Sequence, residues 1–314
     1  EAVSAKLQEN NTPGIYKRLL RDLCGIETAI QCKEEVIKGD QDFFVYLCRD
    51  RVCDCPDPLD QSLRRRVDLL AAEVKQEVNS LRQMVESLQA YVAMQKNLGA
   101  VGLKIGAAYR RSIEFDDVSV SDARRFFDKV LKNDGDLPEN EIKALEDYLL
   151  RREVEACIEQ KMNVVIHTGY QAGLHNDIRN ARATELQSLL NSYPAARFDL
   201  FHGSFPYTGD MTVLGKYFPN VSLNMCWMHI MSPTGSRRAL AEWLDAVPVN
   251  RIFAFGGDYI VAEKVYGHLQ LARADVAEVL AEKIKRGRMT ESDALRIAGL
   301  MFNENPKRWY RLGN

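Results

Sequence analysis

Two histidines and one aspartate each stand where a short apolar run ends. Residues 163–167 end at His167 and residues 198–202 end at His202. A third run, residues 251–258, ends at Asp258 after two glycines. A short apolar run followed by a loop is typical of a buried strand, and the carboxyl ends of parallel strands converge on one side of a barrel. We therefore expect His167, His202 and Asp258 to meet at one site.

The side chains at these positions suit metal chemistry. Imidazole nitrogens and a carboxylate are ligands of divalent transition metals, zinc above all. A histidine beside water on such a metal acts as a base or orients substrate. A single histidine on a strand is more often a structural residue. Here, however, two of the five histidines of the chain occupy the same place in successive units, which favours a functional site.

The elements that must position these residues alternate along the chain. Seven apolar runs predict strands near residues 26–31, 43–48, 100–107, 163–167, 198–202, 221–226 and 252–256. Helical periodicity predicts helices between them, including one long amphipathic helix over residues 62–97. Such alternation is typical of a buried parallel sheet with helical crossovers.

Seven strands are one fewer than a (β/α)8 barrel requires. We therefore predict an α/β fold, a single TIM-barrel domain over residues 1–314 whose first strand belongs in front of residue 1. The chain starts with Glu1, not Met, and its first segment resembles the middle of a domain. An open doubly wound sheet is the alternative. Its dinucleotide-binding version is disfavoured, because no Gly-x-Gly-x-x-Gly stands between a strand and a helix.

The composition narrows the class of protein. The 314 residues are 46% hydrophobic and 27% charged with a net charge of -2, an ordinary globular balance that gives no electrostatic reason to expect nucleic acid. No apolar run approaches the roughly 20 residues of a membrane span. Seven cysteines, an odd number, favour a reducing, cytoplasmic setting. Cys53 and Cys55 form a close pair but lack the second pair of a structural zinc site.

These motifs carry a resemblance to a known family. The strand-end segments 164–169, 198–203 and 253–258, together with the terminal segment 305–310, resemble the amidohydrolase superfamily, in particular the TIM-barrel hydrolases and decarboxylases of amidohydrolase family 2. The segment from Cys226 to Asp258 is also similar to uronate-isomerase-like members. The sequence differs from this family at one point. The family's His-x-His pair on the first strand is absent, since no histidine precedes His167.

The resemblance implies roles for individual residues. His167 matches the metal ligand of the fifth barrel strand, and His202 matches the sixth-strand histidine that touches metal or catalytic water. Asp258 matches the eighth-strand carboxylate that binds metal or moves a proton. Lys104 falls on the fourth strand, where some members hold a carboxylated lysine bridging two metals. A plain lysine is common in this branch, which favours a substrate contact or a structural role for Lys104.

Four further residues are predicted to border the substrate. Tyr109 and Arg110 follow the strand of Lys104, and the guanidinium fork suits a carboxylate; a surface role is the alternative for Arg110. His175 lies in the loop that follows His167. The alternative is that this loop is polar and solvated and does not border the substrate. Trp227 follows the sixth run and is predicted to shape the pocket.

The sequence thus predicts a metal-dependent hydrolase. Its substrate would be a small carboxylate-bearing or sugar-acid-like molecule, attacked by water activated on a divalent metal, for which we expect zinc. Uronate-isomerase-like or decarboxylase activity in the same barrel is the first alternative. A non-catalytic barrel for binding or assembly, with an incomplete metal site, is the second and is favoured by the absent His-x-His pair. We expect neither nucleic acid nor membrane as a partner and leave a homo-oligomer open.

Overall fold

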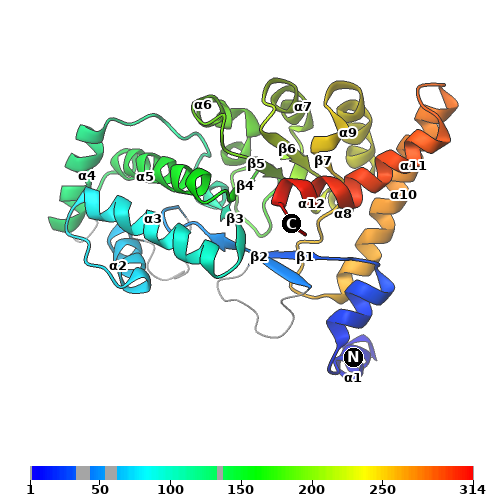
Figure 1. Cartoon of the computed structure of the whole chain (residues 1–314), viewed down its shortest axis with the longest axis horizontal. Helices are drawn as coiled ribbons and strands as arrows, with labels where there is room; N and C mark the ends of the chain where they lie inside the picture. The colour runs from blue at the N-terminus through cyan, green and yellow to red at the C-terminus, as the bar shows by residue number, and fades with distance from the viewer. Residues whose placement is uncertain (1, 33–42, 54–61, 133–136, 314) are drawn as a thin grey trace.

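The computed structural model describes residues 2–32, 43–53, 62–132 and 137–313 and places in them one seven-stranded parallel sheet (Figure 1). Strand order follows the chain, and each strand pairs in parallel with the next. The strands are β1 (Ala29–Cys32), β2 (Phe44–Arg49), β3 (Ala100–Ile105), β4 (Asn163–His167), β5 (Phe198–Phe201), β6 (Val221–Asn224) and β7 (Ile252–Phe253). The seven predicted strands are confirmed.

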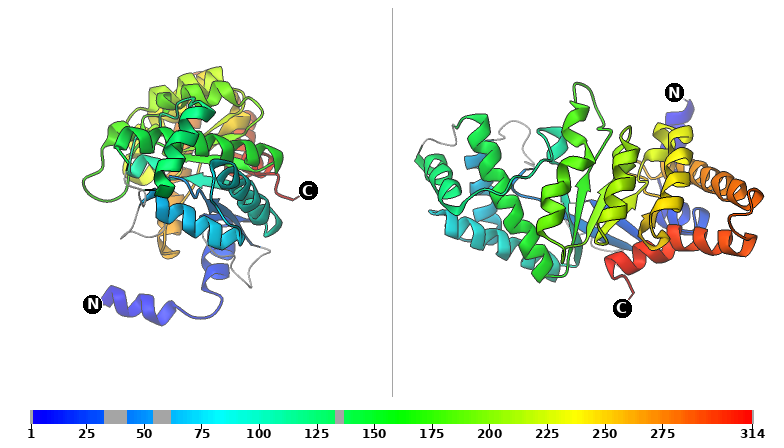
Figure 2. Two further views of the ribbon diagram at one scale, coloured as in Figure 1. Left: turned by 90° about the vertical axis from the view of Figure 1, so that its left-hand side faces the viewer. Right: turned by 90° about the horizontal axis from the view of Figure 1, so that it is seen from above.

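From β2 onward, helices connect successive strands and cover the outside of the curled sheet (Figures 1 and 2). The chain begins with α1 (Ala2–Asn10), which projects from the rest of the molecule (Figure 2). The α-helices that follow are α2 (Leu63–Val74), α3 (Leu81–Asn97), α4 (Val120–Lys132), α5 (Glu139–Glu159), α6 (Gln187–Ser192), α7 (Thr208–Tyr217), α8 (Met228–Met231), α9 (Pro233–Ala246), α10 (Glu263–Lys285), α11 (Glu291–Gly299) and α12 (Asn305–Tyr310). None of the described helices has both the length and the apolar character needed to cross a bilayer.

One predicted element is wrong. The single helix expected over residues 62–97 is two helices, α2 and α3. Lys75 ends α2 in the left-handed conformation, with φ 56°. The Ser80 side chain accepts a hydrogen bond from the Gln83 amide and caps the start of α3. The apolar periodicity continues across the break because both helices bury a face in the same core, so periodicity alone conceals the turn.

The strictly sequential strand order distinguishes a barrel-like sheet from the doubly wound alternative. A doubly wound sheet reverses its strand order at one point, whereas here β1 to β7 follow one another around a single curved sheet. The fold is therefore α/β and TIM-barrel-like. The described residues hold seven strands, and within them β1 and β7 do not pair with each other.

Alternation along the strands decides which residues face the inside of the curl. Val164 and Ile166 of β4 belong to the main core shared with the helices. Val165 belongs to a second, smaller cluster with Leu47, Phe253 and Tyr310 of the C-terminal helix α12. Since side chains two residues apart on a strand share a face, His167 lies on the face of Val165. The inner face therefore carries polar groups at the carboxyl ends of the strands, above an apolar cluster.

Candidate metal centre

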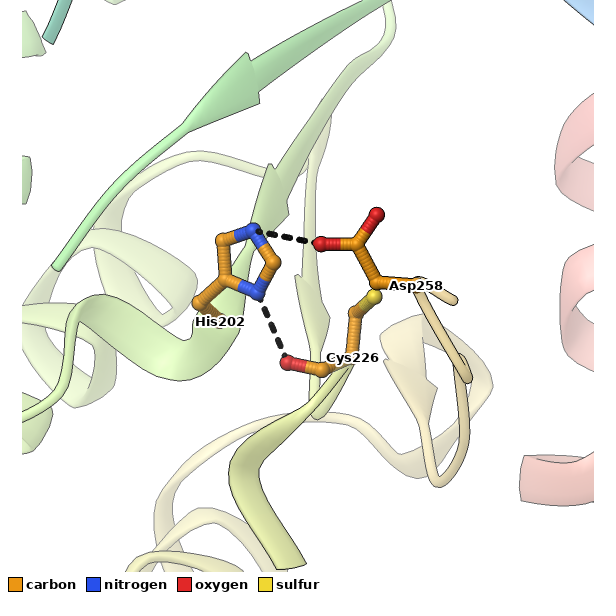
Figure 3. Close-up of side chains that lie close together, drawn as sticks. All are labelled: His202, Cys226 and Asp258. Carbon is orange, nitrogen blue, oxygen red and sulfur yellow. Dashed lines mark hydrogen bonds and ion pairs between the residues drawn. The ribbon is translucent and has the colours of Figure 1, made fainter. Parts of the chain in front are cut away.

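Three side chains from successive strand ends converge at the carboxyl side of the sheet. His202 follows β5, Cys226 follows β6 and Asp258 follows β7 (Figure 3). Their ligand atoms all lie within 4.8 Å of one another, and His202 Nε2 lies 3.9 Å from Asp258 Oδ2. His202 and Cys226 are buried, whereas the Asp258 side chain is 54% exposed. The group is thus reached from solvent on the side of the carboxylate.

The hydrogen bonding of His202 leaves one ring nitrogen available. Nδ1 lies 2.9 Å from the carbonyl oxygen of Cys226, which can only accept, so Nδ1 carries the proton. In the neutral ring the lone pair is then on Nε2, which is buried without a hydrogen-bond partner. Burial, together with the nearby charge of Lys104, lowers the pKa of His202 to about 4, although the Asp258 carboxylate opposes the shift. A neutral imidazole with a backbone acceptor on its other nitrogen is the usual state of a metal-ligating histidine.

The backbone at these strand ends is unusual. His202, Trp227 and Asp258 have φ values of 65°, 64° and 52°. Left-handed conformations of non-glycine residues cost on the order of 1–3 kcal/mol each and cluster at functional sites. At His202 the turn interrupts the strand alternation and redirects the side chain. Gly203 follows with φ 56°, and a Cβ there would meet Met228 Sδ at 2.1 Å, which accounts for the His-Gly pair.

His167 flanks this group. Its buried ring lies 4.4 Å from the ring of His202 and 4.6 Å from the ring of Tyr109, centroid to centroid. Nε2 donates to the carbonyl of Tyr170 at 3.0 Å, so the neutral ring carries its lone pair on Nδ1. Burial, then the charges of His202 and Lys104, holds the pKa of His167 well below its usual value.

The turns that carry the two histidines interlock. The Thr168 hydroxyl donates to the Phe201 carbonyl at 2.6 Å and accepts from the Ser204 amide at 3.1 Å. Gly169, with φ 69°, lies so close to the turn after β5 that a Cβ would stand 2.4 Å from the Phe205 backbone nitrogen. The His-Thr-Gly motif is therefore explained by contact between neighbouring strand ends.

Lys104 lies on the inner face below the histidines. On β3 it is in register with Val165, which pairs in turn with Asp199 on β5. Its Nζ atom is buried and lies 4.9 Å from the centroid of the Phe201 ring. The lysine charge lowers the pKa of both histidines and so reaches the centre electrostatically.

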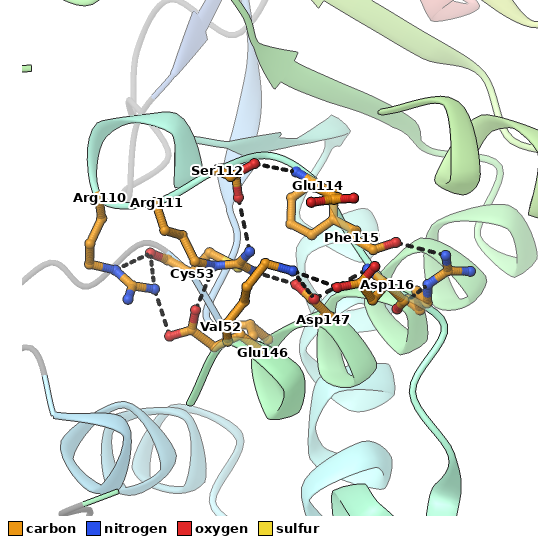
Figure 4. A network of polar contacts seen from close by, with 12 residues as sticks. Val52, Cys53, Arg110, Arg111, Ser112, Glu114, Phe115, Asp116, Glu146 and Asp147 are labelled. Atoms are coloured by element: carbon orange, nitrogen blue, oxygen red, sulfur yellow. Dashed lines mark hydrogen bonds and ion pairs between the residues drawn. The ribbon is translucent and has the colours of Figure 1, made fainter. Parts of the chain in front are cut away.

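The predicted neighbours Tyr109 and Arg110 point to different places. Tyr109 is 46% exposed beside His167, and its hydroxyl accepts from the Ala172 amide at 3.2 Å. Arg110 points into a buried charge cluster, where its Nη2 lies 2.6 Å from Glu146 Oε1 (Figure 4). The structure thus brings Tyr109 to the centre, whereas Arg110 is engaged by Glu146 and the carbonyl of Cys53.

Of the other two predicted neighbours, Trp227 lies beside the centre and His175 does not. Trp227 is half-buried beside Cys226, and its ring lies 5.7 Å from that of the half-exposed Tyr170, so this pair forms part of the rim. His175 lies on the exposed loop after β4 with φ 66°. Among the described residues, no hydrogen bond or ring contact joins it to the centre.

Sequence reasoning missed Cys226. The residue ends the run of β6 as the histidines end theirs, so the positional signal was present. Because cysteine is common in buried positions, its residue type alone does not indicate a functional role. Burial and the Asp258 carboxylate hold the pKa of the Cys226 thiol well above its usual value. Of the earlier cysteine pair, Cys53 is buried and Cys55 lies outside the described residues.

Comparison with known proteins places the fold. No family model matches the chain. A curated relative, Protein fluG of Emericella nidulans, is 26% identical over 224 residues, which cover 68% of this chain and 26% of the relative. The chain thus spans about a quarter of that protein's length.

Solved structures match over nearly the whole chain. Uronate isomerase from Thermotoga maritima has a TM-score of 0.77 at 17% identity, covering 98% of this chain and 72% of its own. Glucuronate isomerase from Caulobacter crescentus has a TM-score of 0.76 at 20% identity, covering 99% and 69%. A presumed metal-dependent hydrolase from Lactobacillus casei has a TM-score of 0.71 at 19% identity, covering 95% and 76%. The chain therefore has the TIM-barrel-like fold of these hydrolase and isomerase structures.

Proposed function

We propose that this chain is a metal-dependent enzyme of the amidohydrolase type that hydrolyses a small carboxylate-bearing or sugar-acid-like substrate. The observation that carries the proposal is the buried, unpartnered Nε2 of His202, aimed at the carboxylate of Asp258. Leaving a buried imidazole nitrogen unsatisfied is costly, and coordination of a cation removes that cost.

The residues present fit a divalent ion. His202 and Asp258 would hold it, and His167 stands beside them with its lone pair on Nδ1. Imidazole and carboxylate donors favour zinc among the divalent metals. When bound, such an ion supplies Lewis-acid activation of substrate and water.

The other residues then take distinct parts. The available lone pair of the neutral His202 ring is on Nε2, so this nitrogen can either coordinate the ion or accept a proton. We assign it to coordination of the ion. Asp258, half exposed at the mouth, accepts or delivers the proton. Lys104 supplies positive charge for a substrate carboxylate, with Tyr109 and Trp227 at the rim.

We also propose that the fold is a complete eight-stranded barrel of amidohydrolase family 2. An eighth strand with a His-x-His pair would lie between β1 and β7, the two edges of the described sheet. Among the described residues, five buried cysteines are free thiols, which supports a reducing compartment; they are Cys24, Cys48, Cys53, Cys157 and Cys226. The isomerase fold neighbours support a second candidate, proton transfer between carbons of a sugar acid.

Metal binding tests the proposal directly. The protein, equilibrated with zinc and dialysed, is expected to retain stoichiometric metal, and His202→Ala is expected to lose it. His175→Ala removes an exposed histidine outside the centre and is expected to retain the metal. Equal metal in the wild type and His202→Ala, or none in either, contradicts the proposal.

Substrate class needs a separate assay. Sugar acids, lactones and aromatic carboxylates with added divalent metal distinguish hydrolysis, decarboxylation and isomerisation by product. Turnover is expected to disappear in His202→Ala. Stoichiometric metal without turnover of any of these compounds favours the non-catalytic alternative.

A further inference from the structure

We propose that Cys226 is a thiolate ligand, so that His202, Cys226 and Asp258 form a three-residue site selective for zinc-like ions over magnesium, calcium and manganese. The inference rests on the proposed metal-dependent function and specifies which residues and which class of ion define its centre.

The first argument is geometric. Three neighbouring strand ends contribute one donor atom each, and these atoms lie within 4.8 Å of one another. With Zn–N and Zn–O bonds of about 2.1 Å and a Zn–S bond of about 2.3 Å, two ligand atoms of one tetrahedral zinc lie roughly 3.4–3.7 Å apart. The 3.9 Å between His202 Nε2 and Asp258 Oδ2 is therefore close to the required spacing.

The second argument is that the site is built around Cys226. Its carbonyl accepts from Nδ1 of His202 and so turns Nε2 toward the carboxylate of Asp258 (Figure 3). Its amide donates to Asn224 Oδ1 at 2.9 Å, which fixes its own backbone. Gly256 packs on the side chain so closely that a Cβ there would stand 2.7 Å from Cys226 Sγ. The sulfur is thus packed against Gly256 and lies within 4.8 Å of a ligand atom of His202 and of Asp258.

The third argument is charge. When an ion binds, the thiol proton leaves to solvent as the sulfur–metal bond forms, and His202 is already neutral. The thiolate and the Asp258 carboxylate together carry two negative charges, which balance a divalent cation in this largely buried place. Thiolate is a soft ligand that zinc and cobalt accept, whereas magnesium, calcium and manganese prefer oxygen.

Cobalt provides a readout that does not depend on activity. Titration of the metal-free full chain with Co²⁺ is expected to give a near-ultraviolet sulfur-to-cobalt charge-transfer band. Cys226→Ser is expected to abolish the band. It is also expected to weaken Co²⁺ binding by at least about tenfold, because even the loss of a group that only hydrogen-bonds to a metal ligand typically lowers metal affinity by about 10–100-fold. Cys32→Ser, which changes an exposed cysteine on β1, is expected to keep the band.

The outcomes separate this inference from the proposed function. Co²⁺ that binds the wild type but not His202→Ala, and gives no charge-transfer band, overturns the role of Cys226 and leaves the metal enzyme intact. Failure of Co²⁺ to bind at all overturns both. X-ray absorption of the zinc-loaded wild type needs no variant: a Zn–S distance near about 2.3 Å supports the inference, and scattering from nitrogen and oxygen alone contradicts it.

Discussion

At the scale of single residues, the centre depends on positions where side chains are small or backbones are left-handed. Gly169 illustrates this, because its missing Cβ lets the turn after His167 rest on the turn after His202. Spacing alone predicted His167, His202 and Asp258 at strand ends. It did not predict Cys226, since a buried cysteine and a ligand cysteine look alike in a sequence.

Gly169→Ala is expected to destabilise the protein and loosen the centre. The new methyl group would meet backbone atoms at 2.4–2.6 Å, and the φ of 69° is strained for alanine. We expect a loss of more than about 1 kcal/mol in the free energy of unfolding, measured by urea denaturation, together with weaker zinc binding. Gly267→Ala, within α10 and with open space around the Cβ, is the control and should stabilise by up to about 1 kcal/mol. Equal effects of the two substitutions contradict this account.

At the scale of elements, a buried charge cluster joins α2, α5 and the turn after β3. Glu146 on α5 pairs with Arg110 and Arg111 at 2.6–2.7 Å (Figure 4). It also pairs with Arg66 on α2 at 2.7 Å. Burial raises the pKa of Glu146, but the three arginines more than offset it and hold the pKa below its usual value. The fork of Arg110 was predicted to meet a substrate carboxylate; the carboxylate that it binds here comes from a helix 36 positions along the chain. Sequence patterns carry little information about such distant partners.

Glu146→Gln is expected to destabilise this cluster strongly. The substitution keeps the shape of the side chain but leaves the cationic groups around it without their shared anion. Breaking a buried pair in this way typically costs about 3–5 kcal/mol, which urea denaturation measures.

Glu86→Gln serves as the control. Glu86 pairs with Arg82 on the exposed face of α3, and such surface pairs contribute at most about 1 kcal/mol. A loss for Glu146→Gln no larger than that of the control would show that the cluster does not hold these elements together.

At the scale of the whole molecule, α12 ties the end of the chain to the inner face of the sheet. The Tyr310 hydroxyl donates to Asp199 Oδ2 at 2.5 Å, and Asn224 donates to the same oxygen at 3.0 Å. The apolar runs predicted the seven strands because buried parallel strands are apolar throughout. They could not predict Asp199 as a buried anchor, since its partners come from β6 and α12.

Asp199 gives the overall stability a distinct pH dependence. Burial raises its pKa from about 4 to about 6, although the hydrogen bonds that it accepts oppose the shift. Because the folded chain holds this proton more tightly than the unfolded chain, the stabilising contribution is complete below about pH 4. It is lost as the pH rises through about 6.

Asp199→Asn tests this dependence. The amide oxygen can accept from Tyr310 and Asn224, and its NH₂ can donate to Ser222, so the shape and bonding are kept. The stability of the wild type relative to Asp199→Asn is expected to fall by roughly 2 kcal/mol between about pH 4 and pH 7. Chemical denaturation of both proteins across this range measures it. Parallel curves would contradict the assignment.

The hydrogen bond between His202 and residue 226 also has a consequence for how this centre can change over generations. The acceptor is a main-chain carbonyl, so every amino acid at position 226 supplies it. The orientation and tautomer of His202 are therefore inherited independently of the side chain beside it. Substitution at position 226 would therefore leave the imidazole aimed, and in the proposed zinc site it would change the preferred ion independently of His202.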